Sequence, residues 1–338
     1  MNAPGPAPAT ADVAHLGVYL SAYLAPFQQW LSDENVTEIL VNQPGEVWTE
    51  SAGSAGMMRH EAQGIDDVLL SRLAAQVARF SHQGINRERP LLSATLPTGE
   101  RIQIVSPPAT RRHFALSIRR HRLLDVPLTA YERETKADVS KSWHERANGT
   151  SDIDFLRQAV RGNATILISG GTSSGKTTFL NALLREIPEH ERVILVEDTP
   201  EIRLGSRNGV GLIAVKGETG EARVSTDDLL QSALRLRPDR IVLGELRGGE
   251  AVSFLRAINT GHPGSFSTIH ANSPSGALEQ LALMVMQSGL GLSRLDTIAY
   301  VRSVVDLIVQ LDRHGGQRGI AAIERTSDIF KSELPSAA

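Results

Sequence analysis

Cysteine is absent from this sequence of 338 residues. Its absence excludes disulfide bonds and zinc sites with cysteine ligands, and it suits a reducing compartment. Aromatic residues make up only 4% of the chain, which argues against extended stacking on single-stranded nucleic acid. The formal net charge of −3 provides no general attraction to a polyanion, so we expect no direct sequence-specific binding of nucleic acid.

Long apolar stretches and basic residues near the N-terminus are also missing. No apolar run approaches the ~20 residues that a membrane-spanning helix needs. Lysine and arginine are absent before Arg59, so we expect no secretory signal. A protein with this sequence is expected to work at a membrane only as a peripheral component.

The first third of the chain predicts a smaller α+β domain over residues 11–122, after a disordered tail at residues 1–10. Alternating apolar residues predict strands in the stretches VTEILVN, EVWTE and HFALSIRRH, and a hairpin around the turn PTGE. The stretch DDVLLSRLAAQVARF predicts an amphipathic helix, whose inward residues are expected to be Val68, Leu69, Leu73, Val77 and Phe80.

The rest of the chain predicts a linker and a second, larger domain. Residues 123–152 are polar with weak periodicity, which is typical of a long linker. Residues 153–338 alternate short β-rich apolar runs with helical stretches. This order predicts an α/β domain built around a mostly parallel sheet.

The strongest motif is GGTSSGKT at Gly170–Thr177, which matches the phosphate-binding pattern G-x-x-x-x-G-K-[ST]. An apolar strand, Thr165–Ser169, is expected directly before it, and a helix, Lys176–Glu186, directly after it. This strand–loop–helix order is the context in which the motif binds a nucleotide.

The residue types of this loop fit ATP with Mg²⁺ as the ligand. Glycines let the backbone turn tightly, while N–H groups and the helix N-terminus attract the phosphates. Lys176 is expected to reach the β- and γ-phosphates, and the Thr177 hydroxyl is expected to ligate magnesium. The predicted nucleotide-binding residues of the loop are Gly170, Gly171, Thr172, Ser173, Ser174, Gly175, Lys176, Thr177 and Thr178.

Acidic residues end two further predicted strands. RVILVEDTPEI places Glu197 and Asp198 at a strand exit, where ligands bind in open α/β sheets. Glu197 is expected to polarise the attacking water, and the alternative is an acidic turn without a catalytic role. RIVLGELRGGE has Gly244 where ATPases usually have a magnesium-binding aspartate. Glu245 is therefore expected to serve the metal, directly or through water, and the alternative is a salt bridge with Arg247.

One histidine and several arginines extend the set of candidates. His270 ends the predicted strand SFSTI and is expected to hydrogen bond, as a neutral imidazole, near the γ-phosphate. Most surface arginines are solvated, and a minority are expected to point at a nucleotide, an anionic lipid or a partner protein. The arginine clusters contain Arg235, Arg237 and Arg240; Arg111 and Arg112; and Arg119, Arg120 and Arg122.

Four stretches together resemble a known family. GGTSSGKTT, ILVEDTPEI, RIVLGELRGGEA and TGHPGSFSTIHANS occur in the order of the Walker A, Asp box, Walker B and His box of the secretion ATPase superfamily. Within that superfamily, the chain most resembles the traffic ATPases of bacterial type IV secretion systems, over roughly Leu24 to Glu324.

The resemblance implies a RecA-like C-terminal P-loop ATPase domain, a smaller N-terminal domain and a homohexameric ring. It implies that Lys176, Glu197, Glu245 and His270 are catalytic, with Thr177 and Glu245 on the magnesium side. It also implies that an arginine of the N-terminal domain approaches the γ-phosphate, and the candidates are Arg119, Arg120 and Arg101. The long linker resembles that of family members in which it repositions the N-terminal domain.

The implied function is ATP hydrolysis that powers assembly of a type IV secretion system and substrate translocation through it. The expected location is the cytoplasmic face of the inner membrane, with other type IV secretion ATPases, inner-membrane components and an anionic lipid surface as partners. A pilus retraction or assembly motor is the alternative from the same superfamily. A RecA-like helicase and a scaffold that only binds nucleotide are the alternatives from other classes.

Overall fold

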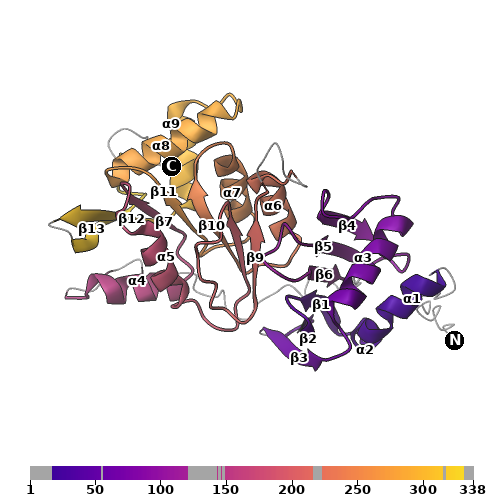
Figure 1. Ribbon diagram of the computed structural model, residues 1–338. Helices are drawn as coiled ribbons and strands as arrows, with labels where there is room; N and C mark the ends of the chain where they lie inside the picture. The colour runs from indigo at the N-terminus through magenta and orange to yellow at the C-terminus, as the bar shows by residue number, and fades with distance from the viewer. Residues whose placement is uncertain are drawn as a thin grey trace, which may run out of the picture. The chain divides into compact units, whose positions relative to one another are not determined.

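The structure is a computed structural model that describes residues 17–54, 56–120, 143, 146, 149–215, 223–314 and 317–330. The chain divides into two compact units (Figure 1). The first comprises Met1–Pro108 and Arg112–Leu124, and the second comprises Ala109–Arg111 and Asp125–Ala338. The predicted N-terminal tail and most of the predicted linker lie outside the described residues, so the expectations for them stay predictions.

The first unit contains a six-stranded antiparallel sheet, in the order β3–β2–β1–β6–β5–β4. Its strands are β1 (Val36–Val41), β2 (Gly45–Ser51), β3 (Met57–Ala62), β4 (Leu91–Thr95), β5 (Arg101–Val105) and β6 (Ala115–Arg119). Strand β3 was not predicted, because its sequence MMRHEA is polar and none of its residues is fully buried. The other strands match the predicted apolar runs.

The helices of the first unit pack with its sheet around one apolar core (Figure 1). They are α1 (Val18–Leu24), the short 3₁₀ helix η2 (Ala25–Phe27), α2 (Gln28–Leu31) and α3 (Asp67–Phe80). Helix α3 forms as predicted, and the Asp66 side chain caps it by accepting from the Leu69 N–H at 2.7 Å. Its predicted inward face is partly wrong, because Val68 and Phe80 are 56% and 46% exposed. The buried stripe follows i, i+3, i+4, i+7 spacing from Leu70.

The second unit is built on a seven-stranded sheet, in the order β13–β12–β7–β11–β10–β8–β9. Its strands are β7 (Ile166–Gly170), β8 (Val193–Glu197), β9 (Gly209–Ile213), β10 (Arg240–Leu246), β11 (Phe266–Ile269), β12 (Leu307–His314) and β13 (Gln317–Arg325). All neighbours are parallel except β12 and β13, which form an antiparallel hairpin. The predicted α/β class is confirmed. Strand β9 was not predicted, because its sequence GVGLI is rich in glycine.

Helices lie on both sides of this second sheet (Figure 1). They are α4 (Asp152–Arg161), α5 (Lys176–Leu184), α6 (Thr226–Ala233), α7 (Glu250–Asn259), α8 (Pro274–Gln287) and α9 (Arg294–Val304). On one side, α4 and α5 share a core with the sheet, and Trp143 from the predicted linker segment is buried in that core. Helices α6 to α9 contact one another in order. Within the described part of the chain, every helix is too short or too polar to cross a membrane.

The outer edge of β9 is covered by a short segment of the second unit, Ala109–Arg111. Thr110 pairs antiparallel with Leu212, and the Ile213 N–H donates to the Ala109 carbonyl at 2.9 Å. This pairing fixes the backbone of Arg111 beside the sheet, although the residues before and after the segment belong to the first unit.

Arg240, which belongs to one of the predicted arginine clusters, has a structural role. It begins β10, at the end of the strand opposite Gly244, and its side chain is 0% exposed. Its guanidinium pairs with both carboxylate oxygens of Glu191 and donates to Asn163 Oδ1 at 2.7 Å. Arg240 is therefore not among the minority of clustered arginines expected to point at a nucleotide.

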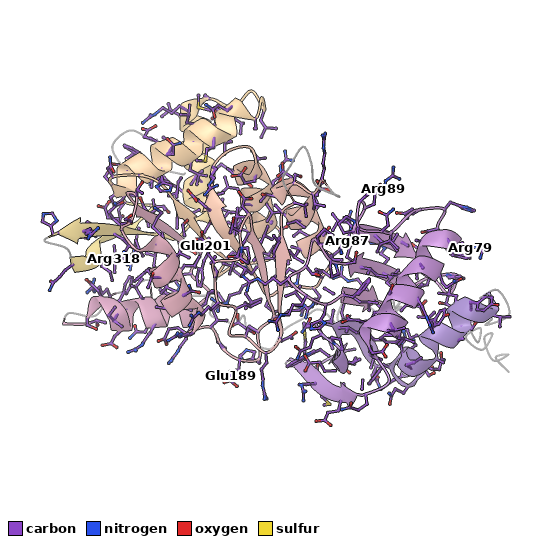
Figure 2. All side chains as sticks on the ribbon, in the orientation of Figure 1. Arg79, Arg87, Arg89, Glu189, Glu201 and Arg318 are labelled. Atoms are coloured by element: carbon purple, nitrogen blue, oxygen red, sulfur yellow. The ribbon has the colours of Figure 1, made fainter. Side chains whose placement is uncertain are left out.

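We predict that Glu191→Ala lowers the free energy of unfolding of the second unit by about 3–5 kcal/mol, because it leaves the buried Arg240 charge without its partner. Urea unfolding followed by circular dichroism measures the change. Glu189→Ala is the matched control, because Glu189 is exposed and points into solvent (Figure 2). Equal effects of the two substitutions would contradict the structural role of the Arg240 pair.

Candidate nucleotide-binding site

Four neighbouring parallel strands of the second unit, β7, β11, β10 and β8, bring their carboxyl ends to one edge of the sheet. A cavity of about 340 Å³ lies there. Glu197, Glu245 and His270 line it from the ends of β8, β10 and β11, and Lys176 lines it from the start of α5, after the loop that follows β7. The structure thus brings together the four residues that the sequence predicts to be catalytic.

The loop between β7 and α5 has the backbone of a phosphate cradle. Ser173 and Gly175 have φ values of 62° and 94°, so the chain turns through the left-handed region just before α5. Helix α5 has no side-chain cap, whereas α4, α6, α8 and α9 are each capped by a serine hydroxyl. The first N–H groups of a helix have no partner within the helix, so those of α5 are available to an anion in the cavity.

Only some of the predicted loop residues line the cavity. Residues 172–178 line the cavity, whereas Gly170 and Gly171 contribute their carbonyl groups to Lys176. A Cβ on Gly170 would collide with Ser174 Oγ and would lie 2.9 Å from the Leu311 carbonyl, so this position requires glycine. Helix α5 ends at Leu184, two residues before the predicted end.

Lys176 is folded back onto its own loop. Its Nζ donates to the carbonyls of Gly170 and Gly171 at 2.8 and 3.1 Å, and to His270 Nδ1 at 3.2 Å. Burial lowers the pKa of Lys176 below its usual value, and the nearby carboxylate of Glu245 partly opposes this effect. An anion that enters the cavity would stabilise the charged form of the amine.

His270 connects Lys176 to Glu245. Because the lysine ammonium can only donate, His270 Nδ1 must accept, and the ring proton must lie on Nε2. That Nε2 lies 2.9 Å from Glu245 Oε1 and donates to it. These contacts are compatible with the hydrogen-bonding role that the sequence predicts for His270, and its place near a γ-phosphate stays a prediction. Glu245 Oε2 accepts from Arg247 at 2.6 Å, so the salt bridge considered as its alternative role is also present.

Glu197 is buried, 3% exposed, and accepts three hydrogen bonds in the cavity wall. Its Oε1 accepts from the N–H groups of Glu201 and Ile202 at 3.0 and 2.8 Å, and its Oε2 accepts from Arg111. A Cβ on Gly244 would point toward this carboxylate, 3.5 Å from Glu197 Cγ. An aspartate at position 244 would therefore place a second negative charge beside Glu197, which explains the glycine in physical terms.

Several residues of the cavity were missed in the sequence. Arg318 lines the cavity from β13, and its Cδ lies 3.0 Å from the position of a Cβ on Gly175; Figure 2 labels it together with Glu201, another lining residue. No local pattern predicts Arg318, because it reaches the loop only through the pairing of β13 with β12. Arg111 carries a weak signal in the cluster RRH, which we expected to be solvated or to bind a nucleotide, a lipid or a partner.

The predicted N-terminal arginines belong to the first unit. Arg119 pairs with the buried carboxylate of Glu38 and lies directly opposite Arg101 across the β5–β6 pair. The Arg120 guanidinium donates to the backbone carbonyls of Asp33 and Val36. Arg119 is thus paired with a carboxylate, whereas Arg120 bonds only to neutral acceptors, and the contact of Arg119, Arg120 or Arg101 with a γ-phosphate stays a prediction. Arg112 is exposed, and Arg122 lies outside the described residues.

A parallel sheet with a glycine-rich loop after one strand and carboxylates at the ends of its neighbours defines the RecA-like class of nucleotide-binding domains. A family model described as type II/IV secretion system protein matches residues 22–330. The chain belongs to this family.

Individual relatives agree over nearly the whole length. The type IV secretion system protein VirB11 of Bartonella quintana is 39% identical over 89% of this chain and 91% of its own. The type IV secretion system protein PtlH of Bordetella pertussis is 40% identical over 93% of this chain and 96% of its own. The crystal structure of the VirB11 ATPase of Brucella suis, in complex with sulphate, has a TM-score of 0.79 and 34% identity, over 91% and 94% of the two chains.

We predict that the affinity for metal-free ADP falls as the pH is raised toward 10, because Lys176 loses its proton below the 10.5 of an ordinary lysine. Isothermal titration calorimetry between pH 7 and pH 10 measures this change. Glu245→Gln removes the carboxylate that raises the pKa, so the affinity of this variant should fall at a lower pH. Constant affinity across this range would contradict the prediction.

Proposed function

We propose that this protein hydrolyses ATP with Mg²⁺ as a motor of a type IV secretion system. One observation carries the proposal, namely that Lys176, Glu197, Glu245 and His270 meet around one cavity at the carboxyl edge of the sheet. A scaffold that only binds nucleotide would need the phosphate loop but not this set of carboxylates and histidine at neighbouring strand ends.

Phosphate binding rests on the loop and on Lys176. The uncapped N-terminus of α5 offers N–H groups, and the ammonium of Lys176 offers a charge that now bonds only to neutral acceptors. The Brucella suis relative was solved in complex with sulphate, an anion with the tetrahedral shape of a phosphate group. On binding, the nucleotide would replace the carbonyls and His270 as the partner of Lys176.

Hydrolysis rests on Glu197 and His270. A carboxylate has about four acceptor sites, and Glu197 uses three for Glu201, Ile202 and Arg111. The remaining site can orient a water molecule toward the γ-phosphate. His270 can donate a hydrogen bond from Nε2 either to Glu245, as it does here, or to an oxygen of the γ-phosphate. Thr177 and Glu245 would hold magnesium through their side-chain oxygens, and the ion would supply charge compensation for the phosphates.

The cellular role follows from the relatives. VirB11 and PtlH are both type IV secretion system proteins, and both match this chain over most of their length. This similarity favours a secretion motor over a pilus motor. We further propose a homohexamer that works at the cytoplasmic face of the inner membrane with other secretion ATPases and inner-membrane components. The residues described around the cavity do not distinguish DNA from protein effectors as the cargo.

We predict that Lys176→Ala abolishes ATP turnover and weakens ATP binding, because it removes the charge that holds the phosphates. Glu197→Gln should keep ATP binding but lower kcat by about 10²–10⁴-fold, because it loses the group that orients water. Coupled measurement of ADP release gives kcat, and a fluorescent ATP analogue gives the affinity.

Glu189→Gln is the control for a carboxylate on the exposed surface of the same unit. A Glu197→Gln variant with kcat near that of wild type would remove Glu197 from the water-orienting role. Absence of turnover in the pure wild-type protein, at any salt or Mg²⁺ concentration, would overturn the proposed activity.

We predict that the protein assembles, in the presence of Mg²⁺ and ATP, into a particle of about six times the 36.6 kDa of one chain. Size-exclusion chromatography with light scattering measures the mass with and without nucleotide. A monomer under all conditions up to about 100 μM would contradict the hexamer but leave the proposed chemistry untouched.

A further inference from the structure

Arg111 is bound to the cavity wall by two hydrogen bonds from one nitrogen. Its Nη2 donates to Glu197 Oε2 and, at 2.7 Å, to the carbonyl of Ile202. The Arg111 side chain is 30% exposed, whereas that of Glu197 is 2% exposed. The arginine therefore reaches from the rim of the second unit to a buried carboxylate.

The sheet is shaped to receive this side chain. Arg111 lies across Gly211 of β9, and a Cβ at that position would lie 2.8 Å from Arg111 Nε and 2.9 Å from Arg111 Cδ. The backbone of the arginine is fixed by the pairing of the preceding residue, Thr110, with Leu212. The side chain of Arg111 thus occupies space that is open because residue 211 is glycine, and its backbone is positioned by the pairing of Thr110.

The two hydrogen bonds of Arg111, together with those of Glu197, connect both ends of the loop that follows β8. Glu197 Oε1 holds the N–H groups of Glu201 and Ile202, while Arg111 ties Glu197 Oε2 to the Ile202 carbonyl. The backbone between these points carries Asp198, Thr199 and Glu201, and all three line the cavity. The position of this wall therefore depends on a charged group that does not itself line the cavity.

We propose that Arg111 is a positioning residue of the ATPase site, which holds Glu197 and the loop at 198–202 in the arrangement that orients the attacking water. The inference rests on the proposed function, because it assigns Arg111 to act through Glu197. The inference concerns Arg111 because it bonds to Glu197 and Ile202, and it does not extend to its neighbour Arg112, which carries the same charge.

The test compares steady-state ATP hydrolysis by the full-length wild-type protein, Arg111→Ala, Arg111→Lys and the control Arg112→Ala. We expect Arg111→Ala to lower kcat by about 10²-fold with little change in KM, because the carboxylate is misplaced while the phosphate loop is intact. Arg111→Lys keeps the positive charge but lacks the planar guanidinium, so its kcat should lie between those of wild type and Arg111→Ala. Arg112→Ala should match wild type.

Two further measurements separate positioning from a general loss of structure. Guanidinium chloride at low millimolar concentration should restore part of the kcat of Arg111→Ala but none of that of Glu197→Gln. Gly211→Ala should lower kcat in the same way, because the added methyl group displaces the Arg111 side chain, whereas Gly205→Ala adds a methyl group in open space and should not.

Each outcome decides between the hypotheses. Unchanged kcat in Arg111→Ala, or an equal loss in Arg112→Ala, would overturn the positioning role while wild-type turnover preserves the proposed function. If Arg111→Ala does not fold, as judged by its melting temperature, then Arg111→Lys and Gly211→Ala decide, and normal kcat in both would overturn the role. A wild-type protein without turnover would overturn the proposed function itself.

Discussion

The parallel alignment of four adjacent strands is the constraint on which the site depends. Because β7, β11, β10 and β8 run in the same direction, the residues at their carboxyl ends meet at one edge, although Lys176 and His270 are far apart in the sequence. The amino ends of the same strands carry a different chemistry. There Arg240 is buried against Glu191 and contributes to folding rather than to the cavity. A single sheet thus separates a structural ion pair from a group of reactive side chains by the length of a strand.

Charges in the cavity are balanced within the protein. Glu197 is balanced by Arg111 and Glu245 by Arg247, and Glu245 also accepts a hydrogen bond from His270. Isolated buried charges are costly, so a nucleotide has to exchange partners with these groups rather than add to them. Lys176 is the group best placed for that exchange, because its present acceptors are neutral. Lys176 bonds to His270, and His270 bonds to Glu245. A ligand that displaces His270 from Lys176 therefore also changes the hydrogen bonding of Glu245.

Local patterns predicted the elements of the fold well where periodicity was strong, and long-range pairing decided the rest. The phosphate loop and the strand-end carboxylates were predicted because each lies within a few residues of its own strand. Strands β3 and β9 were missed because one is polar and the other rich in glycine. Arg111 and Arg318 could not be assigned to the cavity from the sequence. Arg318 lines the cavity through the pairing of β13 with β12, and Arg111 contacts the cavity wall at Glu197 through the pairing of Thr110 with β9. Such pairing leaves no mark in a single sequence.

The cover over β9 has a consequence for the solubility of the protein. An exposed edge strand presents unpaired N–H and C=O groups, which can pair with the edge of another molecule and start aggregation. The segment Ala109–Arg111 occupies the outer edge of β9 and removes part of that hazard. The same three residues therefore couple two properties that are usually separate, the geometry of a buried carboxylate and the protection of a sheet edge. Shortening or stiffening this segment would change the tendency of the second unit to self-associate, even where the phosphate loop is untouched.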